Sequence, residues 1–455
     1  MAMRRALRQM SAEAERSGEG RGEALSMPGS DEARRPRHES EDTGAGLLHA
    51  ALARENMQQA WKRVQANKGA AGIDGLGIDE TKQRLVWEWP VLREQLLRGT
   101  YRPQPVRRVT IPKPQGGQRE LGIPTVVDRL IQQALLQVLQ PLLDPTFSPH
   151  SYGFRPGRSA HQAVQAAQAH IASGRRVVVD VDLEKFFDRV HHDILIDRLR
   201  KRVADAGVIR LVRAYLSSGI MDGGVLMERS EGTPQGGPLS PLLANVLLDE
   251  VDKELERRGH RFVRYADDAN VYVRSRRAGQ RVMAVLVKLY GRLRLKVNET
   301  KSAVASVFQR KFLGFSFWVA AGGKIKRRVA DKAMRTFKHR VRQLTRRSRG
   351  RSLQQVVEQL RSYVLGWKAY FKLADTPKVW KELDQWMRHR MRAIQIKQWR
   401  YGKTAYRELL ARGARPEVAL MVAGNLRRLW RNSGTPLNGV LDLSWADQLG
   451  IPRLC

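Results

Sequence analysis

The stretch Phe262-Val263-Arg264-Tyr265-Ala266-Asp267-Asp268-Ala269-Asn270-Val271-Tyr272-Val273 decides the fold that this sequence predicts. Apolar residues alternate on both sides of its centre, which is typical of two strands joined by a tight turn. Aspartate is common in turns, so an ordinary hairpin is one interpretation. Two adjacent carboxylates, however, repel each other unless cations or water offset their charge. Asp267 and Asp268 are therefore candidate ligands of a divalent metal ion.

A second acidic segment supports the metal site. Val177-Val178-Val179-Asp180-Val181-Asp182-Leu183 is rich in the β-branched residues of a buried strand. It ends near Asp182, and a carboxylate at the end of a buried strand needs a partner. Beside the hairpin, Asp182, Asp267 and Asp268 would hold two hard cations about 3.5–4 Å apart, which suits in-line phosphoryl transfer. Solvated acids in two separate surface turns are the alternative.

The composition indicates a polyanionic partner. The 455 residues include 82 Lys and Arg against 45 Asp and Glu, a net charge of +37, which favours nucleic acid over a membrane surface. No apolar run approaches the roughly 18 residues of a membrane-spanning helix, and no signal peptide precedes the basic N-terminus. The single cysteine, Cys455, excludes disulfides and thiolate zinc sites within the chain. We therefore expect a reducing, cytoplasmic compartment.

The order of the expected elements predicts an α+β protein. The first 45 residues or so lack apolar periodicity and are expected to be disordered. Strand–helix alternation over about 170–320 predicts one sheet with helices, with edge strands at 295–302 and 311–315. An extended two-stranded ribbon is expected over 101–124. Helices are expected near 47–65, 83–97, 128–143, 159–170, 191–213, 242–256 and 281–293.

Two loops are candidate phosphate-binding segments. Lys113 and Arg119 flank the expected turn of the ribbon, where they would either face a triphosphate or be solvated. Residues 232–241, rich in Gly and Pro, precede a helix, and a helix N-terminus of this kind either binds phosphate or is a plain linker. His192, at the start of a helix that follows a strand, is expected to be a structural capping residue.

Beyond residue 322 the composition shifts to basic helices. Residues 324–351 contain thirteen Lys and Arg and one Asp, with apolar residues at helical spacing. One face should therefore pack while the other meets phosphates. Further helices are expected near 353–374 and 378–400, whose aromatic residues are predicted to form a core. The candidate RNA-binding residues are Lys326, Arg327, Arg328, Arg335, Lys338, Arg342, Arg346 and Arg347.

In this order, the segments resemble the reverse transcriptase–maturases encoded by bacterial group II introns. The resemblance covers about residues 50–430, and each motif is weak alone while the ordered set is specific. The matching pieces are Asn67–Gly75, Ile111–Pro114, Arg119–Pro124, Ser151–Gly157, Asp182–Asp188, Gly232–Pro241, Tyr265–Asp268, Lys301, Phe312–Phe315 and, in the maturase (X) region, Gly366–Phe371.

The resemblance implies a right-hand polymerase with fingers, a palm of antiparallel sheet plus helices, and an α-helical thumb/maturase domain. The boundaries expected are 1–45 for a disordered tail, 46–169 for an N-terminal extension and fingers, 170–322 for the palm, 323–435 for the basic thumb/maturase domain and 436–455 for a C-terminal tail.

It also implies roles for individual residues. Asp182, Asp267 and Asp268 would be the catalytic carboxylates and, with Leu183, would hold two Mg²⁺ ions. The dNTP-binding residues would be Lys113, Arg119, Phe186, Phe187, Gln235 and Lys301. Among these, Phe187 would collide with a ribose 2′-hydroxyl and so select dNTPs, and Lys301 would lie near the leaving pyrophosphate.

The function implied is an RNA-directed DNA polymerase that binds its intron RNA and assists splicing and mobility by target-primed reverse transcription. Its partners would be intron RNA, an RNA template with a DNA primer, target DNA and dNTPs, at the nucleoid in bacterial cytoplasm. Many relatives end in a Cys/His-rich endonuclease domain, whereas this chain stops at Cys455. We therefore expect no cleavage of its own target strand and a primer from elsewhere, such as a nascent strand at a replication fork.

Three other functions are alternatives. A splicing maturase with a decayed polymerase is disfavoured because all three carboxylates are present. A retron or CRISPR-associated reverse transcriptase is disfavoured by the maturase-like region and by the lack of a fused CRISPR protein. An RNA-dependent RNA polymerase is disfavoured by Phe187.

Overall fold

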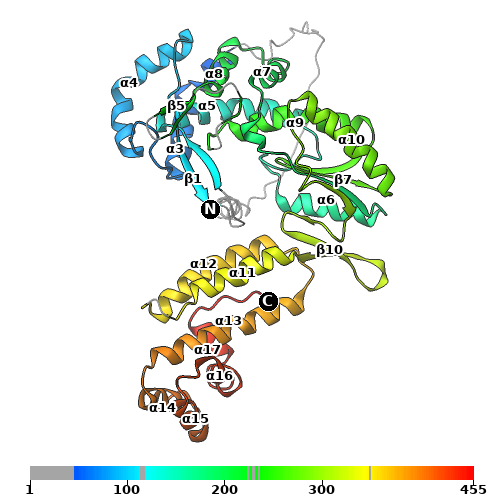
Figure 1. The fold of residues 1–455 in the computed structure, drawn as a ribbon. Helices are drawn as coiled ribbons and strands as arrows, with labels where there is room; N and C mark the ends of the chain where they lie inside the picture. Colours follow the sequence, from blue (N-terminus) through cyan, green and yellow to red (C-terminus); the bar gives the residue numbers. More distant parts are fainter. Residues whose placement is uncertain (1–45, 113–117, 223–224, 228–230, 234–235, 348–349) are drawn as a thin grey trace, which may run out of the picture. The chain divides into compact units, whose positions relative to one another are not determined.

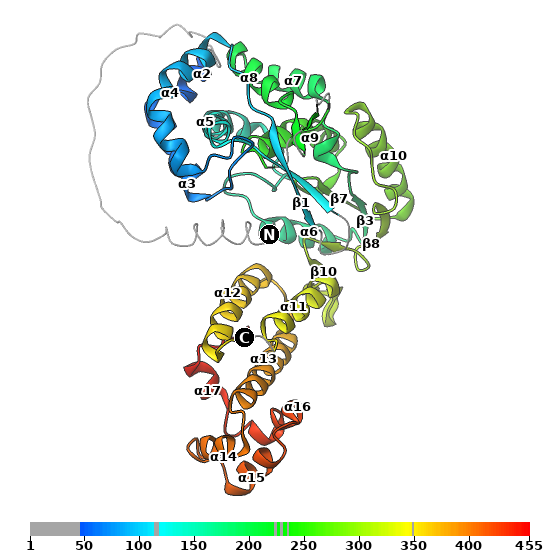
Figure 2. The same ribbon diagram turned by 60° about the vertical axis from the view of Figure 1, so that its left-hand side comes forward.

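The structure is a computed structural model that describes residues 46–112, 118–222, 225–227, 231–233, 236–347 and 350–455, without the side chains of residues 119, 222, 225 and 226. Its contacts separate two compact units (Figures 1 and 2). One ends at Arg310 and the other is formed by Lys311–Cys455. The expected limits of fingers, palm and thumb stay a prediction, because they are functional divisions rather than contact-based ones.

A four-stranded antiparallel sheet, in the order β6-β7-β3-β8, forms the centre of the first unit. The expected valine-rich strand is β3, and the expected hairpin is β6 and β7. The bounds are β3 Val177–Val181, β6 Arg261–Tyr265, β7 Asp268–Val273 and β8 Ala303–Ser306. The edge strand expected at 295–302 is therefore wrong: that segment is irregular, with one bridge at Val297 and a turn at 299–301, and the strand follows it.

Helices cover both faces of this sheet (Figure 1). Helix α10 (Arg276–Arg292) packs closely on one face, where a Cβ on Gly279 would lie 2.5 Å from Val304 and 3.5 Å from Val179 and Val273. Helix α6 (Ala160–Ala172) covers the opposite face, with its His170 ring 5.6 Å from that of Tyr272. Successive strand residues point to opposite faces, so a valine run buried on both sides suits this position.

The remaining helices of the first unit pack around buried α5 and α9, mostly into one hydrophobic core, while Ala60 forms a smaller cluster with Leu130 and Ala134 of α5. The helix expected at 191–213 is in fact two, because Asp205 accepts a hydrogen bond from the Val208 amide and so begins a new helix. The Ser159 cap agrees with the expected start of α6, whereas α4 and α10 begin five residues earlier than expected. The bounds are α2 Leu47–Ala51, α3 Arg54–Ala66, α4 Ile78–Arg98, α5 Val126–Leu143, α7 His192–Arg200, α8 Ala206–Leu216 and α9 Ser240–Arg257.

The expected ribbon belongs to a second sheet. Strands β1 (Val106–Pro112) and β2 (Gln118–Ile123) pair antiparallel as predicted. Strand β1 also pairs in parallel with β4 (Ile220–Asp222), which pairs with β5 (Val225–Met227). These two strands have three residues each, too few for alternation to reveal them.

The second unit begins with a three-stranded sheet, β11-β10-β9. From the sequence, residues 311–315 were expected to extend the β6-β7-β3-β8 sheet. That expectation is wrong, because β9 pairs with β10 in a separate sheet. The segment 324–351 is not all helix either, because its first part is a strand. The bounds are β9 Lys311–Phe312, β10 Phe315–Val319, β11 Ile325–Val329 and α11 Asp331–Leu344.

Aromatic side chains form the core of the helices that follow, as predicted. Trp367 is 2% exposed and its ring centroid lies 4.2 Å from Phe337, 4.8 Å from Phe371 and 5.2 Å from Trp380. The bounds are α12 Leu353–Phe371, α13 Pro377–Gln398, α14 Gly402–Leu410, α15 Pro416–Gly424, α16 Leu429–Asn432 and α17 Leu443–Gln448. In the described part of the chain, no helix is long and apolar enough to cross a membrane.

Residues 436–455, expected to be a tail, are packed against α12 and α13. Ile451 and Leu454 are buried, and Lys368 of α12 donates a hydrogen bond to the carbonyl of Arg453. Buried Asp384 of α13 accepts hydrogen bonds from the amides of Leu454 (2.8 Å) and Cys455 (3.1 Å). One carboxylate therefore fixes the end of the chain.

Replacing Asp384 by Ala should loosen this end, because it leaves two amides without their acceptor. We expect the free energy of unfolding to fall by about 1–3 kcal/mol. Denaturant unfolding measures the loss, and Asp384→Asn, which keeps one acceptor oxygen, is the matched control with a smaller loss. Equal stability of Asp384→Ala and the parent chain would contradict the role of these hydrogen bonds.

Candidate active site

The three carboxylates selected from sequence lie at one end of two neighbouring strands. Val181, the last residue of β3, pairs with Ala269 of β7. Continuing this register by one residue places Asp182 opposite Asp268. Tyr265 pairs with Asp268, which leaves Ala266 and Asp267 as the two residues of the hairpin turn. The backbone thus brings together the acidic residues of two segments that are about eighty residues apart in sequence.

The turn has a backbone conformation that is unusual for its sequence. Ala266 has φ = +58°, a left-handed value that glycine adopts without cost and alanine does not. Backbone strain of this kind persists only where surrounding contacts hold it, and it is frequent at functional sites. Contacts around Ala266 must therefore stabilise this turn.

The segment 298–302 contacts both the backbone and the side chain of Asp182. The Asp182 amide donates to Ser302 Oγ (3.0 Å), and the Asn298 amide donates to the Asp182 carbonyl (2.8 Å). The ammonium group of Lys301, a largely exposed side chain, forms an ion pair with Asp182 Oδ2 at 3.1 Å. Segment 295–302, expected to be a strand, thus fixes the backbone of Asp182, a candidate catalytic residue, and places a cation beside its carboxylate.

The chemistry of these donors fits a hard divalent cation. Carboxylate oxygens are the preferred ligands of Mg²⁺. The ion pair with Lys301 shows that the Asp182 carboxylate can bind a cation. Within the described residues, no three Asp, Glu, His or Cys side chains are close enough together to hold a metal ion as they stand. Leu183 is buried and forms a bridge with Val297, so a contribution to the metal site would come from its carbonyl and stays a prediction.

The loop after β3 lies against the Gly-rich segment expected to contact nucleotide. The Thr233 amide donates to the Phe187 carbonyl (2.7 Å), and the Gly232 amide donates to the Val190 carbonyl (2.8 Å). Phe187 is half-buried, whereas Phe186 is 3% exposed and belongs to the core. A direct contact with nucleotide would therefore fall to Phe187. Lys113 and Gln235, and the side chain of Arg119, lie outside the described residues.

Sequence reasoning missed several residues that hold this loop. The His192 ring does not simply cap its helix as expected, because its Nε2 lies 2.7 Å from the Gly232 carbonyl. Thr233 Oγ1 and Ser240 Oγ are 3.0 Å apart and tie the two ends of the Gly/Pro loop together. Two residues that contact other parts of the site were missed as well: Ser302, which accepts from the Asp182 amide, and Arg264, which donates to the Ala266 carbonyl. Only Arg264 carried a signal, as a charge in the middle of an apolar strand.

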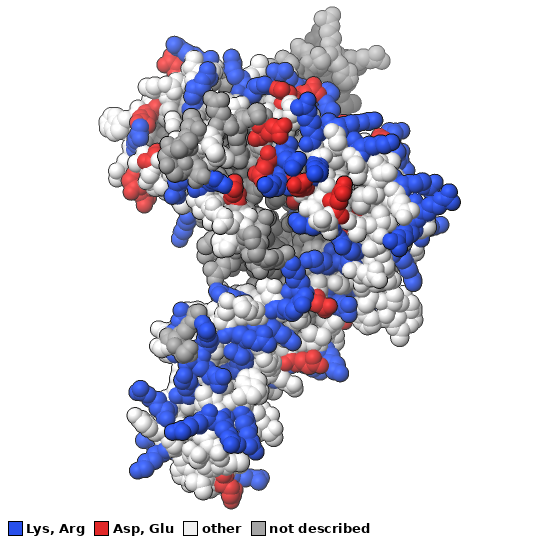
Figure 3. Space-filling model, viewed as in Figure 1, with Lys and Arg blue, Asp and Glu red and all other residues white. Residues whose placement is uncertain are grey.

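Positive charge is spread over the face of the second unit that Figure 3 shows. Arg328, Arg335, Arg342, Arg346 and Arg347 are exposed, and Lys326 and Lys338 are half-buried. Arg327 differs, because it forms an ion pair with Asp375 at 3.2 Å and its side chain is only 16% exposed. Lys326, Arg327 and Arg328 also lie on β11 rather than on a helix.

One part of this surface combines arginine with tryptophan. The guanidinium groups of Arg342 and Arg390 lie 5.6 Å and 5.5 Å from the ring centroid of Trp386. Burial, followed by the nearby charges of Arg342 and Arg347, lowers the pKa of Arg390. Clustered arginines that disfavour one another's charge are suited to a polyanion, which would relieve the repulsion.

Comparison with known protein families agrees with this geometry. Residues 111–317 match the family described as "Reverse transcriptase (RNA-dependent DNA polymerase)". Residues 334–413 match the family described as "Group II intron, maturase-specific domain". The first match contains the three carboxylates, and the second contains most of the basic helical region.

Individual relatives are bacterial and mitochondrial. Protein YkfC of Escherichia coli is 39% identical over 218 residues, which are 47% of this chain and 57% of that protein. The group II intron-encoded protein LtrA of Lactococcus lactis is 29% identical over 342 residues, 59% of this chain and 56% of that protein. This chain thus spans little more than half the length of these curated relatives. A solved partial Cas6-RT-Cas1–Cas2 complex is 28% identical over 54% of this chain and 42% of its own, with a TM-score of only 0.36.

The carboxylates at the end of the paired strands lie within the stretch that matches the reverse transcriptase family, so the geometry and the match point to the same class of protein for residues 111–317. The maturase-specific match follows it, and in this order the two matches make the chain similar to the group II intron-encoded proteins such as LtrA. Reverse transcriptases use divalent metal ions.

Proposed function

We propose that this chain is an RNA-directed DNA polymerase that also binds the RNA of a group II intron and assists its splicing. The observation that carries the proposal is the β3–β7 register, which puts Asp182 opposite Asp268 with Asp267 in the adjoining turn. A maturase-specific region in the same chain favours the intron RNA as a second partner.

In this proposal Asp182, Asp267 and Asp268 hold two Mg²⁺ ions. When bound, these ions activate the primer 3′-hydroxyl and neutralise charge on the triphosphate. The ammonium of Lys301 then breaks its ion pair with Asp182 and donates hydrogen bonds to the leaving pyrophosphate instead. The ring of Phe187 occupies the space that a ribose 2′-hydroxyl would need. Lys113, Arg119 and Gln235 are proposed to contact the triphosphate and the base.

Primer extension tests the polymerase, with an RNA template, a DNA primer, dNTPs and Mg²⁺. We expect full-length complementary DNA. Absence of extension, together with tight binding to the flanking intron RNA and faster intron splicing, would instead identify a splicing maturase without polymerase activity. The two activities are therefore measured on the same preparation.

The proposed activity also suggests a DNA target and a place in the cell. We propose that target DNA and its primer are used for intron mobility by target-primed reverse transcription. We also propose that the protein works in bacterial cytoplasm at the nucleoid, where that DNA lies. The high net positive charge of +37 supports a nucleic-acid partner in each case.

RNA binding should depend steeply on salt. If about six of the predicted basic residues contact phosphates, the slope of log K against log salt is about −4, and doubling the salt weakens binding roughly 20-fold. Filter binding of intron RNA from about 100 to about 200 mM KCl measures this slope.

The double variant Arg346→Ala/Arg347→Ala should make that slope shallower by about 1. Arg257 and Arg258, also adjacent and exposed, pair with Glu254 at the end of α9, and their double alanine variant is the matched control. An unchanged slope in the 346/347 variant would remove these two arginines from the RNA interface.

A further inference from the structure

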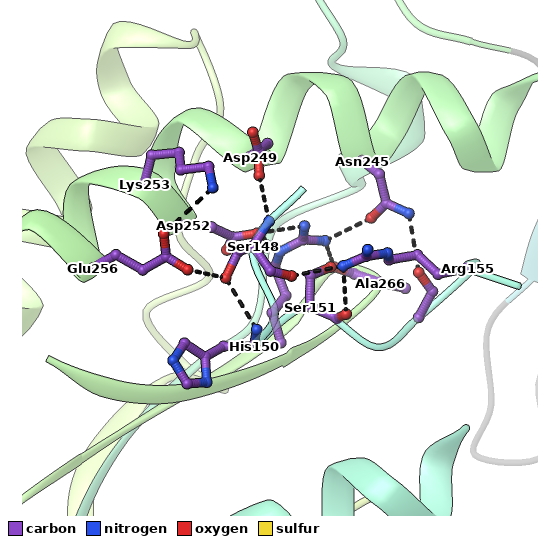
Figure 4. Close-up of polar contacts among 12 residues, drawn as sticks. Ser148, His150, Ser151, Arg155, Asn245, Asp249, Asp252, Lys253, Glu256 and Ala266 are labelled. Atoms are coloured by element: carbon purple, nitrogen blue, oxygen red, sulfur yellow. Dashed lines mark hydrogen bonds and ion pairs between the residues drawn. The ribbon is translucent and has the colours of Figure 1, made fainter. Parts of the chain in front are cut away.

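A buried ion pair contacts the turn that carries Asp267 and Asp268, and Figure 4 labels its Asp252 together with Asn245 and the turn residue Ala266. Arg264 is in the middle part of β6 and Asp252 is on α9, and both side chains are 1% exposed. The Arg264 Nε donates to both Asp252 oxygens at 2.9 Å, and its Nη2 donates to Oδ2 at 2.6 Å. An arginine and an aspartate thus share a bidentate contact inside the protein.

The third nitrogen of Arg264 reaches the turn itself. Its Nη1 donates to the Ala266 carbonyl at 2.9 Å and to Asn245 Oδ1 at 2.9 Å. Ala266 is the residue with the left-handed backbone, directly before Asp267. A charged donor therefore holds the carbonyl of the strained residue from inside the protein.

Asn245 connects the same group to a neighbouring segment. Its Nδ2 donates to the Gly153 carbonyl at 3.0 Å. Gly153 lies against the turn so closely that a Cβ there would be 2.2 Å from the Ala266 amide nitrogen. The Tyr152 amide also donates to the Arg264 carbonyl at 2.8 Å. The turn is thus held by segment 151–153 on one side and by the Arg264 guanidinium on another.

A buried ion pair is not explained by stability alone. Taking both charges out of water costs as much as their attraction returns, and apolar replacements are often at least as stable. Desolvation acts to lower the pKa of Arg264, but the Asp252 carboxylate outweighs it and the pKa is raised. Desolvation raises the pKa of Asp252, which Arg264 opposes. The pair therefore keeps a fixed, planar, charged donor at a buried place that its net contribution to stability alone does not explain.

We propose that Arg264 is a positioning residue of the polymerase: its guanidinium, oriented by Asp252 and Asn245, fixes the Ala266 carbonyl and with it the place of Asp267 and Asp268. This rests on the proposed function. Groups that orient metal ligands from behind commonly change metal affinity or activity 10–100-fold when removed. A lysine lacks the planar fork and cannot serve Asp252, Asn245 and Ala266 together.

The experiment separates positioning from stability with two variants. Arg264→Met alone leaves Asp252 buried without its partner and is expected to unfold at lower temperature. The double variant Arg264→Met/Asp252→Leu removes both charges and should regain the melting temperature of the parent chain. We expect it to remain about 100-fold lower in kcat for primer extension, with a KM for dNTP within roughly threefold. Arg264→Lys should regain less than about a tenth of the activity.

A second readout does not depend on turnover. Binding of Mn²⁺ alone, measured by electron paramagnetic resonance, should weaken roughly tenfold in the double variant. Arg202→Met is the matched control, because Arg202 pairs with Asp249, another fully buried aspartate of α9, at 2.7 Å, and is not in contact with the turn through any described hydrogen bond. It should bind Mn²⁺ and extend primers as the parent chain does.

Each outcome is decisive. Recovery of kcat and Mn²⁺ affinity together with the melting temperature in the double variant would reduce Arg264 to a structural residue and overturn the proposal. A parent chain that does not extend primers would overturn the proposed function instead. In that case the Mn²⁺ titration alone decides whether Arg264 positions the carboxylates.

Discussion

Replacing Asp267 by Asn abolishes primer extension, with a loss of at least about 10³-fold, or about 4 kcal/mol in the activation free energy. The substitution keeps the shape of the side chain in the two-residue turn but removes a negative charge that a divalent cation requires. Binding of intron RNA should stay unchanged, because the predicted RNA-binding residues lie in the second unit. Steady-state extension and filter binding measure the two properties.

Asp197→Asn is the matched control for this experiment. Asp197 is an exposed aspartate of α7 that pairs with Lys201, and its loss removes the same charge away from the strands' end. Full activity of both variants would mean that the turn carboxylate is not part of the metal site. Loss in both would indicate a general effect of charge.

Replacing Phe187 by Ala lets ribonucleotides in. The half-buried ring follows Asp182 by five residues, and its carbonyl is fixed by the Thr233 amide, so truncation opens space without freeing the backbone. We expect the ratio of kcat/KM for dNTP over rNTP to fall by on the order of 100-fold, mainly through a rise for rNTP. Single-nucleotide incorporation with each substrate gives the ratio.

Phe187→Leu serves as its control, since it keeps most of the bulk and should keep most of the discrimination. Continued rejection of rNTPs by Phe187→Ala would show that another group excludes the 2′-hydroxyl. Phe186 is no substitute for this test, because it belongs to the core and its truncation would lower stability.

The sequence was informative where one periodicity dominates. The valines of β3 and the alternation around Asp267 predict buried strands, and the Ser159 capping box predicts the start of α6. These signals are local, so they survive without knowledge of the fold. The three carboxylates come together because they sit at the ends of such well-marked strands.

The expectations that failed depended on non-local pairing. Strand β11 has the sequence Ile325-Lys326-Arg327-Arg328-Val329, where charge conceals two buried apolar ends, and only its pairing with β10 makes it a strand. Asp205, a helix cap, was overlooked within a continuous helical pattern. The partners of Arg264 lie on a helix, and sequence spacing does not show which helix face meets which strand. Tertiary contact thus overrides local propensity at β11 and Arg264, whereas the Asp205 cap is an exception, because it is a local signal.

The separation of the candidate catalytic residues Asp182 and Asp268 is set by main-chain geometry. Adjacent strands of a sheet are about 4.7–4.9 Å apart whatever their side chains, and Asp182 and Asp268 continue one antiparallel ladder. The valines beneath them can therefore vary in size while this spacing persists, provided that the strands do not slip. A slip of one residue would turn Asp182 to the opposite face of the sheet. Selection at this site should accordingly act on strand register as strongly as on the acids themselves.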